Sequence, residues 1–217
     1  EAARGLGVER FIHTSTSETY GTAQYTPIDE KHPLRGQSPY AASKIGADKL
    51  AESYHLSFGL PVAILRPFNT YGPGQSARAV IPTIICQGLD GEVIRLGLVT
   101  PLRDFLYVKD TVAGFIKIAE SPDATGEVIN LGSGAAISIG EVADRIIDLV
   151  GGGRRVVYDE GRVRPRASEV MELLCDNRKA RDVMGWQPQV SLEEGLQATI
   201  DFIRRHRERY KPETYNI

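Results

Sequence analysis

Residues 10–21 read RFIHTSTSETYG, a short apolar run that leads directly into a cluster of hydroxyl and acidic side chains. The run from Arg10 to Ser15 is typical of a buried β-strand. A long polar loop then continues as far as Ser38. In open sheets of parallel strands, ligands bind beyond the carboxyl ends of the strands. The polar cluster after Ser15 therefore stands where such a sheet would hold a ligand.

Strand and helix signals alternate along the rest of the chain. Ser38-Pro39 is a typical helix start, with a capping hydroxyl and proline in the first turn, and Gly59 is a typical stop. Ser138 and Ser191 each begin a capping box with a glutamate three residues later. The expected strands span residues 10–15, 61–65, 93–96, 105–108, 128–131 and 155–158, and the expected helices span 39–58, 79–87, 110–120 and 138–150, with a last helix from residue 191. This alternation favours an α/β fold with a mainly parallel sheet.

Composition narrows the class of protein. The 217 residues are enough for the core of one domain or of two small ones. Apolar residues make up 41% and charged residues 25%, which is typical of a globular chain and excludes a disordered or fibrous one. A net charge of −2 without a basic block argues against nucleic acid as a partner. No apolar run reaches the length of a membrane span. We therefore expect a soluble, cytoplasmic protein with no membrane partner.

The cysteines and histidines offer no metal-binding pattern. Cys86 and Cys175 are far apart in the sequence, so they could form one disulfide, although two reduced thiols are the favoured interpretation. The four histidines lack the spacing of metal ligands, and no metal is predicted. His13 falls within the first strand, where we expect a buried residue that is hydrogen-bonded.

Tyr40 and Lys44 are the strongest candidates for chemistry. They stand four residues apart in SPYAASK, so on a helix they share one face. A tyrosine hydroxyl is a weak base at neutral pH, and a neighbouring ammonium stabilises the phenolate that proton abstraction from a sugar hydroxyl requires. An ordinary amphipathic helix could carry this pair by chance, and the pair alone does not decide between the two.

Thr16 and Glu18 add a second group of candidates. Thr16 can donate a hydrogen bond to a substrate oxygen, and Glu18 carries a carboxylate that can transfer a proton. Alone, the segment would be interpreted as a hydroxyl-rich turn with one exposed glutamate. Its position about twenty residues before the Tyr40–Lys44 pair, at the end of a buried strand, favours a functional role.

Five motifs occur in a fixed order and together identify a family. They are STSETYG (15–21), SPYAASK (38–44), RPFNTYGPGQ (66–75), RDFLYVKD (103–110) and VINLGSG (128–134). The chain resembles the extended short-chain dehydrogenase/reductase family, and within it the nucleotide-sugar epimerases and 4,6-dehydratases. The resemblance implies a Rossmann-like fold with a mainly parallel sheet and a smaller C-terminal part that binds the substrate. It places a boundary between residues 1–70 and 71–217, with later elements returning to the first part. It also implies a homodimer formed through the helix around residues 40–58.

Within this family the segment after Ser15 separates the reactions. The resemblance implies a small residue at position 18 in 4-epimerases, whereas Thr16-Ser17-Glu18 is similar to the 4,6-dehydratases of the GDP-mannose type. A dehydratase must also remove the C5 proton and expel the C6 hydroxyl, so it needs an extra acid/base, and Glu18 is expected to provide it, with Ser17 in support. We expect an NAD-dependent nucleotide-sugar 4,6-dehydratase. The alternatives are a UDP-glucose 4-epimerase-like enzyme and a non-catalytic relative that binds a nucleotide sugar.

The resemblance also implies ligand-binding residues. The catalytic set is Thr16, Ser17, Glu18, Tyr40 and Lys44; the residues for NAD are Thr14, Ser15, Tyr40, Lys44, Arg66 and Pro67; and those for the nucleotide sugar are Asn69, Val80, Arg103 and Arg164. For Arg103 an ion pair with Asp104 or Asp110 is the structural alternative. The segments SARAVIPTII, RVRPRASEV and LLCDN are similar to dehydratases of bacterial legionaminic-acid pathways, which implies an N-acetylglucosamine nucleotide. Whether the nucleotide is UDP or GDP stays open.

One family feature is missing from the sequence. The Gly-rich loop that binds the cofactor's phosphates comes well before the STSETYG strand in this family, and here that strand begins near the start of the chain. We therefore expect a fragment of a longer protein whose N-terminal cofactor half is absent, and the choice between NAD and NADP cannot be inferred. The turn Gly132-Ser133-Gly134 follows a strand, but Ile137 replaces the third glycine of a dinucleotide motif, so it is not interpreted as one.

Overall fold

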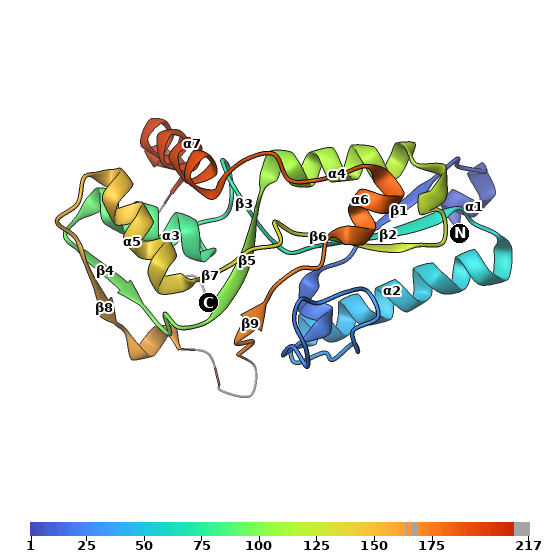
Figure 1. The fold of residues 1–217 in the computed structure, drawn as a ribbon, viewed down its shortest axis with the longest axis horizontal. Helices are drawn as coiled ribbons and strands as arrows, with labels where there is room; N and C mark the ends of the chain where they lie inside the picture. Colours follow the sequence, from blue (N-terminus) through green and yellow to red (C-terminus); the bar gives the residue numbers. More distant parts are fainter. Residues whose placement is uncertain (164, 166–168, 211–217) are drawn as a thin grey trace.

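Three parallel strands form the centre of one half of the molecule. In the computed structural model, which describes residues 1–163, 165 and 169–210, β1 (Phe11–Thr14), β2 (Val62–Pro67) and β6 (Val128–Leu131) are hydrogen-bonded in the order β1-β2-β6. Both pairings are parallel, so the carboxyl ends of all three strands meet at one edge of the sheet. Figure 1 shows this edge turned toward the middle of the molecule.

Helices cover both faces of this sheet. Val62 and Ile64 pack with residues of α2 (Pro39–Phe58), while Ala63 and Leu65 pack with residues of α4 (Val108–Glu120) and α6 (Arg178–Met184) on the other face. A strand that is covered on both faces needs apolar residues at every position, which is why the run from 62 to 65 does not alternate with polar residues. A short helix, α1 (Ala2–Leu6), precedes the sheet.

The other half of the molecule is built around β5 (Leu102–Tyr107), the long strand that runs between the two halves in Figure 1. It pairs with β3 (Asn69–Tyr71) and β9 (Glu172–Leu173) in parallel and with β7 (Ala136–Ser138) antiparallel. A separate parallel pair joins β4 (Val93–Leu96) and β8 (Arg155–Tyr158). The helices α3 (Val80–Asp90), α5 (Ile139–Val150) and α7 (Leu192–Arg205) enclose the largest core cluster.

Four short 3₁₀ helices complete the described elements: η1 (Ser17–Tyr20), η2 (Pro122–Ala124), η3 (Glu160–Arg162) and η4 (Arg207–Arg209). The architecture is the expected α/β arrangement with Rossmann-like parallel sheets. The chain leaves the first sheet at Pro67 and enters β3 at Asn69, close to the boundary expected at residue 70. The division into two domains stays a prediction.

Element bounds agree with the local sequence signals where those signals are strong. The helix expected over 39–58 is confirmed, with the Ser38 hydroxyl accepting a hydrogen bond from the Ala41 N–H and Gly59 in the left-handed region at φ 66°. Both capping boxes form. Several bounds differ from the expected ones. β5 begins at Leu102 instead of 105, α3 ends at Asp90 instead of 87, and α4 begins at Val108 instead of 110.

Two simple properties of the described residues bear on the expectations from composition. No helix among them is long and apolar enough to cross a membrane. Cys86 and Cys175 are both buried as free thiols, so the favoured interpretation over a disulfide is confirmed.

Gly195 on α7 allows the helix to approach β3 and β5. A Cβ atom at this position would clash with Tyr71 Oη and lie 2.9 Å from Tyr107 Cδ2. Gly195→Ala should therefore lower the free energy of unfolding by about 1–3 kcal/mol, because the packed core resists an added methyl group. Denaturant unfolding measures this difference. Gly46→Ala on α2, where an added Cβ meets nothing within 4 Å, is the matched control and should not destabilise the protein. Equal stability of the two variants would contradict the prediction.

Candidate functional site

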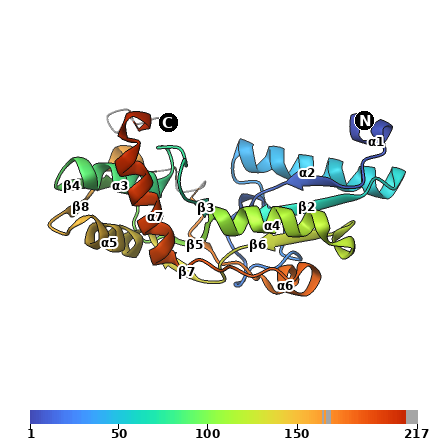
Figure 2. The same ribbon diagram turned by 90° about the horizontal axis from the view of Figure 1, so that it is seen from above.

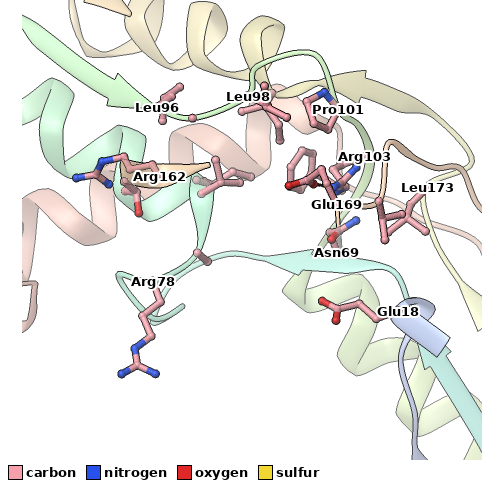
Figure 3. A pocket seen from close by; sticks show the side chains of 18 of the residues that line it. Glu18, Asn69, Arg78, Leu96, Leu98, Pro101, Arg103, Arg162, Glu169 and Leu173 are labelled. Carbon is pink, nitrogen blue, oxygen red and sulfur yellow. Dashed lines mark hydrogen bonds and ion pairs between the residues drawn. The ribbon is translucent and has the colours of Figure 1, made fainter. Parts of the chain in front are cut away.

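A cleft of about 690 Å³ opens where the two halves of the molecule meet. The carboxyl end of the first sheet contributes Glu18 and Tyr40, and the second half contributes Asn69, Val80 and Arg103. Figure 3 shows Glu18, Asn69 and Arg103 on one side of the cleft, with Leu96, Leu98 and Pro101 along another wall. Five of the predicted site residues, from five separate stretches of sequence, therefore line one cavity.

The turn that carries Glu18 is held by its own sequence. Thr16 begins η1, and its hydroxyl accepts a hydrogen bond from the Glu18 N–H at 3.3 Å. Gly21 ends η1 at φ 64°, and a Cβ there would lie 2.6 Å from the Arg35 carbonyl oxygen, so glycine is required on both counts. The Glu18 side chain is partly buried and faces the cleft (Figure 3). The proposed acid/base is thus fixed at its backbone and open at its carboxylate.

Tyr40 and Lys44 occupy the first turns of α2. The Tyr40 side chain is 50% exposed and lines the cleft. Lys44 Nζ donates a hydrogen bond to the Thr14 carbonyl oxygen at 2.8 Å, so the ammonium stands at the carboxyl end of β1. Four residues of helix separate the two side chains, which gives them a common face. The pair therefore adjoins both the end of the sheet and the cleft.

Arg103 forms an ion pair that the sequence did not suggest. Its guanidinium Nη2 lies 3.0 Å from Glu169 Oε1, and both side chains are nearly buried. The expected partners of Arg103, Asp104 and Asp110, were wrong because both carboxylates accept hydrogen bonds from other groups. Asp104 points to the other face of β5, where it accepts hydrogen bonds from Ser133, Gly134 and Cys175, and Asp110 accepts one from the Val190 N–H. Glu169 lines the cleft beside Arg103, as Figure 3 shows.

Asp104 also accepts hydrogen bonds from the backbone of the Gly132–Gly134 turn. The N–H groups of Ser133 and Gly134 donate to the two carboxylate oxygens of Asp104 at 2.7 and 2.9 Å. N–H groups that cradle a buried carboxylate are not offered to a phosphate. The interpretation of this turn as something other than a dinucleotide loop is therefore confirmed.

Several predicted residues lie beneath the cleft rather than on its wall. Ser15, Ser17 and Arg66 are buried, with Ser15 Oγ donating to Asp48 Oδ2 at 2.9 Å. The Arg66 guanidinium donates to the same Asp48 oxygen, so a cofactor contact at this position falls to the backbone and stays a prediction. Thr14, Thr16, Lys44 and Pro67 are near the same edge of the sheet but are not part of the cleft wall. Arg164 lies outside the described residues.

The structure adds residues that the sequence analysis did not assign to the site. Arg78 and Glu169 line the cleft together with the polar side chains of Gln37, Thr70 and Gln75. Arg162 also lines it and contacts Asp159 at 3.1 Å; it belongs to the arginine-rich segment in which one binding arginine was expected, but Arg164 was assigned that role. No sequence signal distinguishes Arg78 or Glu169 from charged residues on a solvated surface, because only the fold brings them to one cavity.

The described residues contain no cluster of three or more histidine, cysteine, aspartate or glutamate side chains that could hold a metal ion. His13 lies on β1 with Nε2 at 3.1 Å from Asp48 Oδ1, although neither atom makes a well-directed hydrogen bond. The expectation of a buried, hydrogen-bonded histidine is therefore wrong: His13 is only partly buried, and its Nε2 contacts a carboxylate without a well-directed hydrogen bond.

Known proteins with similar sequences catalyse two related reactions. The family model for GDP-mannose 4,6-dehydratase matches residues 1–199. A dTDP-glucose 4,6-dehydratase of Streptomyces griseus is 34% identical over 214 residues, which cover 98% of this chain and 64% of the relative. A UDP-glucose 4-epimerase of Mycolicibacterium smegmatis is 34% identical over 210 residues, covering 94% and 65%. Overall identity therefore does not separate dehydratases from epimerases.

The fold is also similar to that of a relative whose structure has been solved. DesIV of Streptomyces venezuelae, a dTDP-glucose 4,6-dehydratase with NAD bound, superposes with a TM-score of 0.86 at 32% identity, covering 97% of this chain and 64% of DesIV. Across these comparisons the chain spans a little under two thirds of the length of its relatives.

Proposed function

The chain belongs to the NAD-dependent epimerase/dehydratase branch of the extended short-chain dehydrogenase/reductase family, and from this membership we propose that the protein is a nucleotide-sugar 4,6-dehydratase. Such an enzyme oxidises the sugar at C4, eliminates water across C5 and C6, and reduces C6 to give a 4-keto-6-deoxy sugar. The observation that carries the proposal is the presence of the Glu18 carboxylate in the same cleft as Tyr40. An epimerase has no step that uses this extra acid/base.

The residues at the end of β1 fit the nicotinamide end of NAD. The Lys44 ammonium has three N–H donors, and the Thr14 carbonyl takes one of them, so the ammonium is held at the sheet edge where donors to ribose hydroxyls would be needed. We propose that Lys44 and Tyr40 hold this end of the cofactor, with the backbone of residues 14–15 and 66–67 beside it. NAD, when bound, supplies the redox partner for C4 and C6. Solved relatives such as DesIV bind NAD, which supports this choice.

The proton steps belong to two side chains. Tyr40 takes the proton of the C4 hydroxyl, with the Lys44 ammonium stabilising its phenolate and Thr16 supporting the substrate oxygen. The C4 ketone then acidifies the C5 proton, and Glu18 removes it. The C6 hydroxyl leaves as water with a proton returned by Glu18, directly or through a water. When C6 is then reduced, C5 takes a proton that comes from solvent, which is why deuterium is expected there. Ser17 supports Glu18 through the turn that both occupy, since its own side chain is buried.

The nucleotide sugar is proposed to lie along the cleft between the two halves. Arg103 offers a planar guanidinium that suits a diphosphate, and Asn69 and Val80 line the same cleft. Asn69 Nδ2 donates to the Asp104 carbonyl at 3.3 Å, which fixes its amide beside β5. An N-acetylglucosamine nucleotide is the proposed substrate, on the resemblance to the legionaminic-acid enzymes. A homodimer through α2 is proposed on the same ground.

A 4-epimerase is the second candidate, because a curated 4-epimerase is as similar to this chain as the dehydratase is. The experiment that separates them incubates the complete protein with NAD and UDP-N-acetylglucosamine in deuterated water and follows the sugar by mass spectrometry. A dehydratase gives a product that has lost one water and gained deuterium at C5. An unchanged mass with inverted C4 would contradict the proposal and identify an epimerase. If neither occurs, the GDP and dTDP sugars are tested in the same way.

A further inference from the structure

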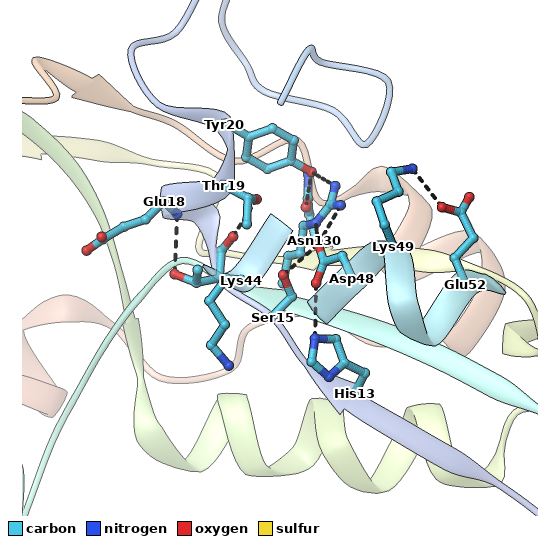
Figure 4. Close-up of polar contacts among 12 residues, drawn as sticks. His13, Ser15, Glu18, Thr19, Tyr20, Lys44, Asp48, Lys49, Glu52 and Asn130 are labelled. Atoms are coloured by element: carbon cyan, nitrogen blue, oxygen red, sulfur yellow. Dashed lines mark hydrogen bonds and ion pairs between the residues drawn. The ribbon is translucent and has the colours of Figure 1, made fainter. Parts of the chain in front are cut away.

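Asp48 and Lys44 of α2 contact three consecutive residues at the carboxyl end of β1, namely His13, Thr14 and Ser15. Asp48 comes four residues after Lys44 and eight after Tyr40, so the three side chains form one stripe along α2. The Asp48 carboxylate contacts Ser15 and His13, and Lys44 contacts the Thr14 carbonyl between them. Asp48 is only 1% exposed, and Figure 4 shows its contacts with Ser15 and His13. The helix that carries the catalytic pair is thereby fixed to the strand that leads to Glu18.

Arg66 extends this attachment to the far end of η1. Its Nε and Nη2 donate to Asp48 Oδ2 at 3.1 and 2.8 Å, and its Nη1 donates to Tyr20 Oη at 3.0 Å. Tyr20 is the last residue of η1, is fully buried, and donates in turn to Asn130 Oδ1 at 2.7 Å. Ser15 precedes η1 and Tyr20 ends it. The turn that carries Glu18 is therefore anchored at both ends by the same ion pair.

The charges of this cluster are balanced. Burial opposes ionisation of Asp48, but the contacts with His13, Ser15 and Arg66 outweigh it, so the pKa of Asp48 lies below its ordinary value. Burial raises the pKa of Tyr20 to about 12, although Arg66 acts in the opposite direction, so the phenol stays neutral. Buried ion pairs of this kind often contribute little to stability, since desolvation offsets their attraction. A role in geometry is therefore a better explanation of the pair than a role in stability.

We propose that the Asp48–Arg66 ion pair is a positioning device that sets the place of the Glu18 turn relative to Tyr40 and Lys44. This inference rests on the proposed function, because it concerns the alignment of the acid/base groups of that reaction. Neither Asp48 nor Arg66 lines the cleft, so both act through the residues they hold. Misplacing a catalytic group by about 1 Å can lower a rate about 10²-fold.

The test uses two variants of the complete protein that remove the anchor without leaving a buried charge unpaired. Asp48→Leu/Arg66→Met replaces the pair by apolar side chains, which proteins often tolerate without loss of stability. Tyr20→Phe removes one hydroxyl and keeps the ring packed against Phe68. For both, kcat should fall while KM for the nucleotide sugar is unchanged, by about 10²-fold for the double variant. Arg204→Ala on α7, which is in an exposed pair with Asp201 and does not line the cleft, is the control and should keep kcat.

Amide hydrogen exchange gives a second measurement that does not depend on activity. Residues 15–20 should exchange faster in both variants than in Arg204→Ala. Folded variants with wild-type kcat, or with unchanged exchange over these residues, would overturn the inference. A wild-type protein that turns over no nucleotide sugar would count against the proposed function instead, and the exchange measurement would then decide the anchoring by itself. If the double variant does not fold, Tyr20→Phe carries the test.

Discussion

Glu18→Gln should abolish dehydration of the nucleotide sugar while leaving its binding intact. Glutamine keeps the size of the side chain and the backbone N–H that Thr16 caps, so the η1 turn should be preserved. It cannot take the C5 proton or return one to the leaving hydroxyl. General acid–base groups contribute about 10²–10⁴-fold to a rate, and elimination of water should fall by that amount. The measurement is the rate of water loss, followed by mass spectrometry under single-turnover conditions.

The same variant separates elimination from the earlier chemistry. Oxidation at C4 depends on Tyr40 and should continue, so the C4 ketone should form while deuterium uptake at C5 is lost. Glu9→Gln, which changes an exposed glutamate two residues before β1, is the matched control and should dehydrate at the wild-type rate. Dehydration by Glu18→Gln at the rate of that control would contradict the role assigned to Glu18 and would favour the epimerase reading of the cleft.

The strands and helices that were predicted within a residue or two are those with local signals. The strands at 93–96, 128–131 and 155–158 have the bounds that their apolar runs indicate, and the helices begin at Ser38, Ser138 and Ser191 where capping residues stand. The missed strands β3, β7 and β9 are two or three residues long and exist because they pair with β5. Their cause lies in distant residues, which a local pattern does not contain.

In the candidate site, too, some contacts follow from local sequence and others depend on distant residues. Glu18 and Tyr40 could be predicted to meet because both follow the carboxyl end of one strand, and the cleft contains both. The Arg103–Glu169 pair joins residues 66 positions apart, and no spacing rule relates them. Asp48 is a sharper case. A single aspartate within a long helix is typical of a solvated face, yet it is almost completely buried against Arg66 and Ser15.

Tyr40→Phe should stop every reaction that begins at C4, whether the protein is a dehydratase or an epimerase. The Tyr40 ring is half exposed on the cleft wall, so removing its hydroxyl leaves no buried partner unsatisfied and should not change the thermal unfolding temperature. Only the rate of the chemical step should fall, because phenylalanine cannot take the C4 hydroxyl proton. We expect turnover to fall by about 10²–10⁴-fold with nearly unchanged binding of the nucleotide sugar.

Steady-state kinetics on each nucleotide sugar that the wild type converts, together with equilibrium binding, measures this effect. Tyr158→Phe is the matched control, because Tyr158 is an exposed tyrosine at the end of β8 that does not line the cleft. The comparison with Glu18→Gln is the decisive one. If Tyr40→Phe loses all chemistry and Glu18→Gln loses only the elimination of water, then Tyr40 acts in the oxidation at C4 and Glu18 acts in the elimination. Full turnover by Tyr40→Phe would instead remove the basis for placing catalysis at this end of α2, since Lys44 cannot by itself take a proton while it remains an ammonium ion.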